Sequence, residues 1–135
     1  MNNFSQLRTI FYALAVGQIG FAAVVYYLNG GNTNVSDMPI FTLLVPAVLL
    51  GSAGMAYFLN QRLAEQEAAE TTPEGRFAAY RRRVIIRLAM LEGANLMAVV
   101  AVLLTGKMNF FLFFLLGMLI FYYFQPKESE MAGGV

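Results

Sequence analysis

The sequence has no cysteine, histidine or tryptophan, and charged residues make up only 13% of its 135 positions. Without cysteine or histidine, the chain cannot form disulfides, Cys/His zinc sites, His-ligated haem or a Ser-His-Asp triad. Soluble domains carry about 25% charged residues, and the net charge of +1 gives no field for attracting nucleic acid. We therefore expect a single membrane domain over residues 1–135, with no cofactor, no metal and no nucleic-acid partner.

Apolar side chains are abundant instead, at 59% of residues with a mean hydropathy of +0.60. They gather in four stretches close to the ~20 residues that a helix needs to cross a bilayer. The stretches lack a period-two alternation, and lipid tolerates only helices or closed barrels. The sequence thus predicts an all-α integral membrane protein with four transmembrane helices, over Ile10–Leu28, Ile40–Leu59, Val84–Leu104 and Met108–Phe124.

Basic residues indicate the orientation of these spans. The segment between spans two and three carries five arginines, whereas the loop 29–39 has no lysine or arginine. The positive-inside rule then places this segment and both termini in the cytoplasm, with the chain in a bacterial inner membrane.

The segment 60–83 is predicted to be a helical extension of the membrane domain. Its first part, NQRLAEQEAAE, consists of strong helix formers. Thr72 is then suited to be an N-cap, with Pro73 as the first helical residue and Glu74 in the first turn. We expect headgroup anchoring by four arginines, and the extension could alternatively dock a soluble partner. These arginines are Arg81, Arg82, Arg83 and Arg87.

The two halves of the chain show an internal similarity. When Ile10 is aligned with Ile86, Gly17 falls on Gly93 and Leu28 falls on Leu104. A second alignment places Gly51 on Gly117. A duplication of this kind predicts two parallel helical hairpins.

Small residues recur at helical spacing in the first three spans. Because lipid provides no hydrophobic force between helices, close backbone approach at small residues commonly holds such bundles together. We therefore predict that the first three spans pack through eight small residues. They are Ala13, Gly17, Gly20, Ala47, Gly51, Gly54, Ala89 and Gly93.

Glu92 is the only acidic residue inside a predicted span, and it lies near the middle of that span. An ionised carboxylate at this depth is costly, so Glu92 should be protonated or paired. Polar residues at similar depth are Asn95, Gln18 and Ser52. The cluster could join helices, could bind a proton or cation, or could contact a partner subunit or lipid.

Two resemblances follow from these features. The run IIRLAMLEGANLMAVVAVLL resembles the acid-bearing helix of rotary-ATPase proteolipid subunits, which implies an ion-binding role for Glu92. In this chain, however, the acid lies on the first helix of its hairpin, and the connection between spans two and three is longer than in that family. The whole chain, with its stretch YRRRVIIRLAMLEGANLMAVVAVLLTGKMNFF, is similar to small uncharacterised four-helix inner-membrane proteins of Gram-negative bacteria.

No set of nucleophile, base and orienting residue is present in the sequence, so we expect no enzyme. The favoured hypothesis is an accessory or structural subunit of a larger membrane complex, or a homo-oligomeric scaffold. Its partners would be the lipid bilayer and other membrane subunits or copies of itself. The alternative is a small proton- or cation-conducting protein that uses Glu92.

Overall fold

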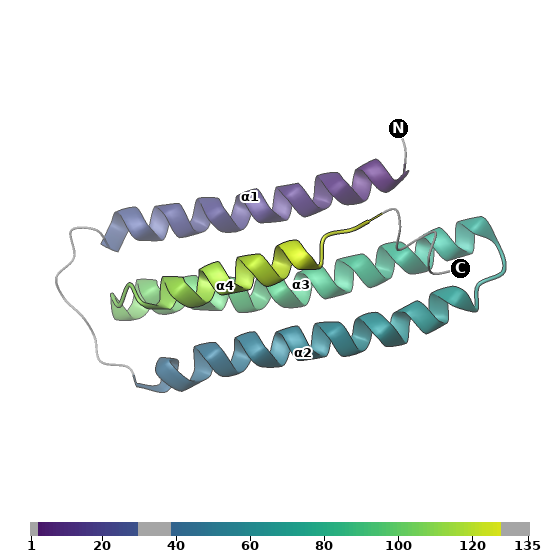
Figure 1. The fold of residues 1–135 in the computed structure, drawn as a ribbon. Helices are drawn as coiled ribbons and strands as arrows, with labels where there is room; N and C mark the ends of the chain where they lie inside the picture. The colour runs from purple at the N-terminus through teal and green to yellow at the C-terminus, as the bar shows by residue number, and fades with distance from the viewer. Residues whose placement is uncertain (1–2, 30–38, 128–135) are drawn as a thin grey trace.

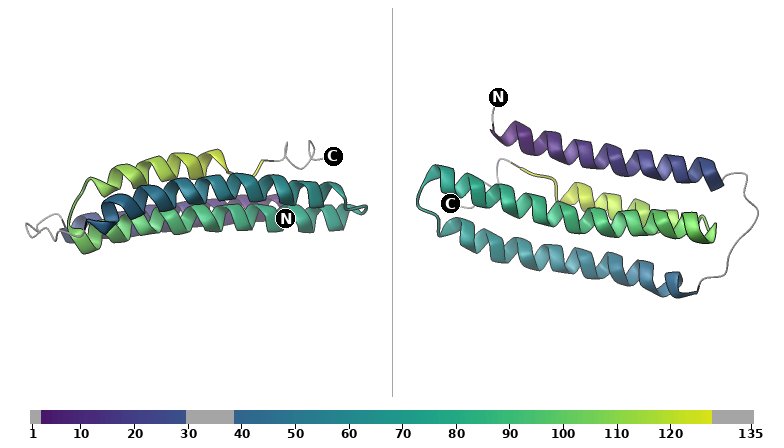
Figure 2. Two further views of the ribbon diagram at one scale, coloured as in Figure 1. Left: turned by 90° about the horizontal axis from the view of Figure 1, so that it is seen from below. Right: turned by 180° about the vertical axis from the view of Figure 1, so that it is seen from behind.

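A computed structural model describes residues 3–29 and 39–127, which form four α-helices (Figure 1). They are α1 (Asn3–Asn29), α2 (Ile40–Ala68), α3 (Pro73–Thr105) and α4 (Phe110–Tyr123). Successive helices run in opposite directions, with α3 lying between α1 and α2 and α4 packed along α3 (Figures 1 and 2). The predicted outer loop and the C-terminal tail fall mainly on 30–38 and 128–135, outside the described residues.

Three of the four helices are long and apolar enough to cross a membrane, which confirms an all-α architecture suited to the bilayer. The fourth is shorter than predicted. With 14 residues, α4 extends about 21 Å at 1.5 Å per residue, against a hydrocarbon thickness of about 30 Å. It begins after a turn that follows Gly106, which ends α3 in the left-handed conformation with φ 72°. It stops before Gln125, whose helical conformation is disfavoured by Pro126.

The helical extension between the second and third spans is confirmed. The second helix continues to Ala68, and a short turn leads into α3 at Pro73. Thr72 is the N-cap, and its Oγ1 accepts a hydrogen bond from the Gly75 N–H at 3.0 Å. Glu74 lies in the first turn, where its charge complements the helix dipole.

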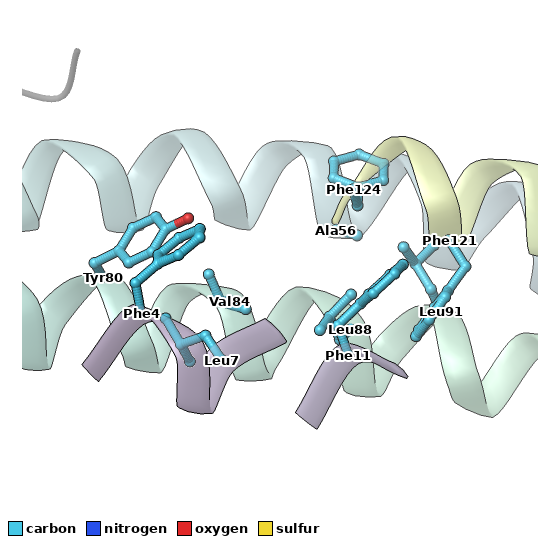
Figure 3. Packing of buried hydrophobic residues seen from close by; sticks show 10 residues of the cluster. All are labelled: Phe4, Leu7, Phe11, Ala56, Tyr80, Val84, Leu88, Leu91, Phe121 and Phe124. Atoms are coloured by element: carbon cyan, nitrogen blue, oxygen red, sulfur yellow. The ribbon is translucent and has the colours of Figure 1, made fainter. Parts of the chain in front are cut away.

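The core follows one face of α3. Half of the apolar window of α3 is buried, against 22% for α1 and 17% for α2. Large side chains fill this interior: Phe11 of α1 stacks on Phe121 of α4 with ring centroids 5.0 Å apart, next to Leu88 and Leu91 of α3 (Figure 3). The central helix thus contacts each of the other three.

The predicted packing through small residues is wrong within this chain. All eight of these residues are exposed on the outside of the bundle. A Cβ atom added at any of the five glycines among them would meet no neighbouring atom within 4 Å. The small residues that are buried are others, among them Ala56, Ala98 and Ala101. The eight predicted residues form part of the outer surface.

Candidate functional site

The structure brings together only two members of the predicted polar cluster. Asn95 of α3 donates a hydrogen bond from Nδ2 to Oε1 of Gln18 on α1, at 2.8 Å. Both side chains are 1% exposed. Gln18 also donates from Nε2 to the Leu14 carbonyl one turn earlier in α1, at 3.2 Å. The pair therefore joins α1 to α3 inside the bundle.

The other side of Asn95 is closed by a glycine. Asn95 Oδ1 is buried without a hydrogen-bond partner among the described residues. It lies so close to Gly117 of α4 that a Cβ atom added there would collide with it. Nδ2 also lies 3.6 Å from the Met118 sulfur. This tight contact leaves no room for an ion or water between Asn95 Oδ1 and Gly117.

Gly117 was not recognised as part of the site from the sequence. A signal was present, since it is the only small residue in FFLFFLLGMLIFYY, the sequence of α4. A single glycine among large apolar residues often marks a position where another helix comes close.

Glu92 and Ser52 lie apart from this pair. Each is half-buried, and neither forms a hydrogen bond or ion pair with any residue that the structure describes. Glu92 lies near the edge of the buried face of α3, beside the exposed residues Ala89 and Gly93. It is a single carboxyl group, and within residues 3–29 and 39–127 no three acidic side chains come together as a metal site would require. Alone, it could carry a proton or bind a group from another molecule.

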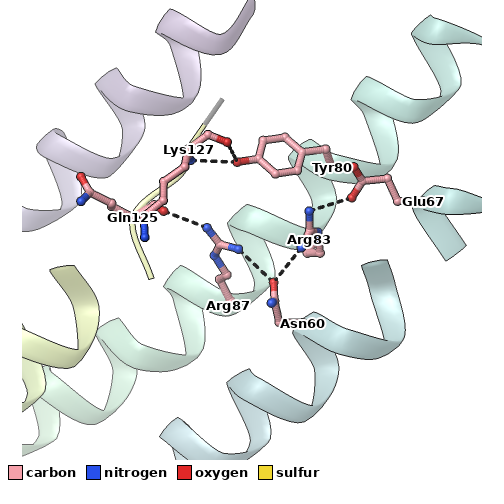
Figure 4. Close-up of polar contacts among 7 residues, drawn as sticks. All are labelled: Asn60, Glu67, Tyr80, Arg83, Arg87, Gln125 and Lys127. Carbon is pink, nitrogen blue, oxygen red and sulfur yellow. Dashed lines mark hydrogen bonds and ion pairs between the residues drawn. The ribbon is translucent and has the colours of Figure 1, made fainter. Parts of the chain in front are cut away.

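A second polar centre, which the sequence analysis missed, lies where the polar ends of α2 and α3 pack together (Figure 4). Arg83 forms an ion pair with Glu67 at 2.9 Å, and the two side chains are 6% and 2% exposed. Asn60 Oδ1 accepts hydrogen bonds from Nη1 of Arg87 at 2.9 Å and from Nη1 of Arg83 at 3.4 Å. These contacts join the extension of α2 to α3.

Arg87 also holds the chain that follows α4. It is 1% exposed, and it donates from Nε to the Phe124 carbonyl at 2.9 Å and from Nη2 to the Gln125 carbonyl at 3.0 Å. Further along, the Tyr80 hydroxyl donates to the Lys127 carbonyl at 3.0 Å and accepts from the Lys127 N–H at 3.1 Å. Residues 124–127 are thus fixed against α3 by two side chains (Figure 4).

The predicted headgroup role is therefore wrong for two of the four arginines. Arg83 and Arg87 are buried and bind protein groups, whereas Arg81 and Arg82 are exposed. A signal was present for Arg87, because helical spacing places it on one face with the large residues Tyr80 and Leu91. The structure buries both of them.

Comparison of the chain with protein-family models, with curated proteins and with solved structures finds no match.

Proposed function

We propose that this chain is a non-enzymatic multi-pass membrane protein that acts by assembling with other membrane chains, as a scaffold of identical copies or as a subunit of a larger complex. The proposal includes a bacterial inner membrane, cytoplasmic termini and two duplicated hairpins. The observation that carries it is the position of Glu92. Glu92 is half-buried within an apolar helix, and its carboxyl group has no hydrogen bond or ion pair with the described residues.

A neighbouring membrane chain would remove the energetic cost of this arrangement. Carboxyl groups in transmembrane helices almost always face a protein interior or a polar partner, because lipid does not solvate them. The residues flanking Glu92 on the outside of α3 are small, namely Ala89 and Gly93. Small residues allow the backbone of another helix to approach closely enough for a hydrogen bond to the carboxyl group.

The test is the mass of the natively purified protein in lipid nanodiscs, with mass spectrometry of every bound chain. We expect a multiple of 14.9 kDa or stoichiometric foreign subunits. Replacing Glu92 by leucine should shift the particle toward the single chain, whereas Glu92→Gln, which keeps hydrogen-bonding groups, should largely retain assembly. Glu65→Leu, at an exposed position of α2, is the matched control. A wild-type protein found only as a single chain would refute the proposal.

Proton or cation conduction through Glu92 is the second candidate. The observation in its favour is that Glu92 is partly accessible and stays outside the sealed Gln18–Asn95 pair. Liposomes containing the protein would then show a flux that Glu92→Gln abolishes without a loss of thermal stability. Equal flux in the two proteins would exclude this function.

A further inference from the structure

The outer face of α3 carries a groove at the junction of its polar and apolar parts. Its volume is about 480 Å³, and Arg81, Arg82, Ile85 and Ile86 are among its lining residues. Glu74, Phe77 and Ala78 complete the lining. All the lining residues belong to α3, so the groove is present in a single chain.

The two arginines of this groove are available for binding. Their neighbour Arg83 points into the protein and pairs with Glu67. Arg81 and Arg82, by contrast, are exposed, and neither makes an ion pair or hydrogen bond within residues 3–29 and 39–127. Of the three consecutive arginines, Arg83 therefore stabilises the fold. Arg81 and Arg82 place two adjacent positive charges at the surface.

The apolar end of the groove begins one turn further along α3. Ile85 and Ile86 follow the arginines by about 6 Å along the axis, and they open the long apolar part of the helix. Glu74, the one acid in the lining, lies about 10 Å from Arg81 in the opposite direction. The groove thus presents positive charge beside apolar side chains, with its acid at the far end.

We propose that this groove binds the headgroup region of one anionic phospholipid. The phosphate lies at Arg81 and Arg82, and the start of an acyl chain packs on Ile85 and Ile86. Guanidinium groups bind phosphate in a bidentate geometry, and basic residues beside an apolar helix end attract anionic lipid. The site is independent of the assembly proposed above, since it needs no second chain.

Tryptophan fluorescence can test this site directly, because the chain contains no tryptophan. Ile85→Trp places a single reporter in the groove, and Leu115→Trp places one on the exposed surface of α4. Each protein is reconstituted in phosphatidylcholine vesicles with brominated phosphatidylglycerol or brominated phosphatidylcholine as quencher. We expect stronger quenching by phosphatidylglycerol at position 85 and equal quenching by the two lipids at position 115.

Arginine replacement then assigns the preference to the groove. Near a membrane surface, each basic residue contributes about a fivefold preference for anionic lipid. Arg81→Gln with Arg82→Gln should therefore lower the preference at position 85 by up to about 25-fold, while lysine at both positions should retain most of it. Arg62→Gln, at an exposed position of α2, removes one positive charge elsewhere and should leave the preference intact.

Three outcomes would overturn the assignment. The first is equal quenching by the two lipids at position 85. The second is a preference that Arg62→Gln lowers as much as the groove variants do, because this would indicate general surface charge. The third is loss of the preference when inorganic phosphate replaces chloride at equal ionic strength, because the ligand would then be free phosphate rather than a lipid.

Discussion

At the scale of single residues, the lack of a side chain at Gly117 allows α3 and α4 to pack closely. Asn95 is fully buried and uses its amide nitrogen to bind Gln18, and its oxygen is directed at Gly117. A glycine at this place lets the asparagine remain inside the bundle, where it links α1 to α3. The five exposed glycines that were predicted to pack helices have no comparable neighbour.

Gly117→Ala should destabilise the protein by about 1–3 kcal/mol, because the new methyl group collides with Asn95 Oδ1 and forces α3 and α4 apart. The measurement is reversible unfolding in mixed micelles. Gly51→Ala is the control: its methyl group meets nothing within 4 Å, and alanine favours the helix by up to about 1 kcal/mol. Equal stability changes in the two variants would show that the contact at Gly117 contributes nothing.

At the scale of helices, α4 is the element that depends most on its neighbours. It is too short to cross the bilayer alone, and Arg87 binds the carbonyl groups of the two residues after its end. Helix ends leave backbone carbonyl groups without partners, and a cation near a C-terminus is favourable. Arg87 of α3 therefore supplies a cation near the C-terminus of α4, whose own last turn contains no basic residue.

Arg87→Met should lower the free energy of unfolding by about 2–4 kcal/mol, since it leaves buried carbonyl groups unpaired while preserving much of the side-chain volume. Hydrogen exchange at residues 121–127 should rise more than at residues 10–20 of α1. Arg62→Met, at an exposed arginine of α2, should change stability by less than about 0.5 kcal/mol. Unchanged exchange at 121–127 in the Arg87 variant would contradict this role.

Local signals in the sequence were sufficient for much of the fold. Hydropathy predicted the four helices, and the Thr72-Pro73-Glu74 signal predicted the start of α3. The polar centres were harder to predict, because their partners are distant in sequence. Asn95 was grouped correctly with Gln18 by depth, whereas the partners of Arg87 depend on where α4 ends, which hydropathy does not determine.

At the scale of the whole molecule, the arrangement of the helices determines which segments lie at the same end of the bundle. The start of α1, the end of α2 and the start of α3 lie at one end of the bundle, and the turn between α3 and α4 lies at the other (Figure 1). The arginine-rich part of the chain is at the first end. Our proposal that this end faces the cytoplasm rests on the positive-inside rule.

Single cysteines can test this orientation, because the native chain has none. Gln66→Cys, near the end of α2, should react with a membrane-impermeant maleimide only in inverted vesicles. Asn109→Cys, in the turn before α4, should react only in right-side-out spheroplasts. Both positions are exposed, so labelling of both from the same side would refute the arrangement.

The contact between Arg87 and the chain after α4 has a consequence for biogenesis. A helix of 14 residues is shorter than a segment that inserts independently, and the carbonyl groups of the two residues after its end bind an arginine of the preceding helix. Because α3 precedes α4 in the chain, Arg87 is synthesised before these two partners. We therefore expect α3 and α4 to leave the insertion machinery as a pair, with maturation complete only when residues 124–127 have been translated.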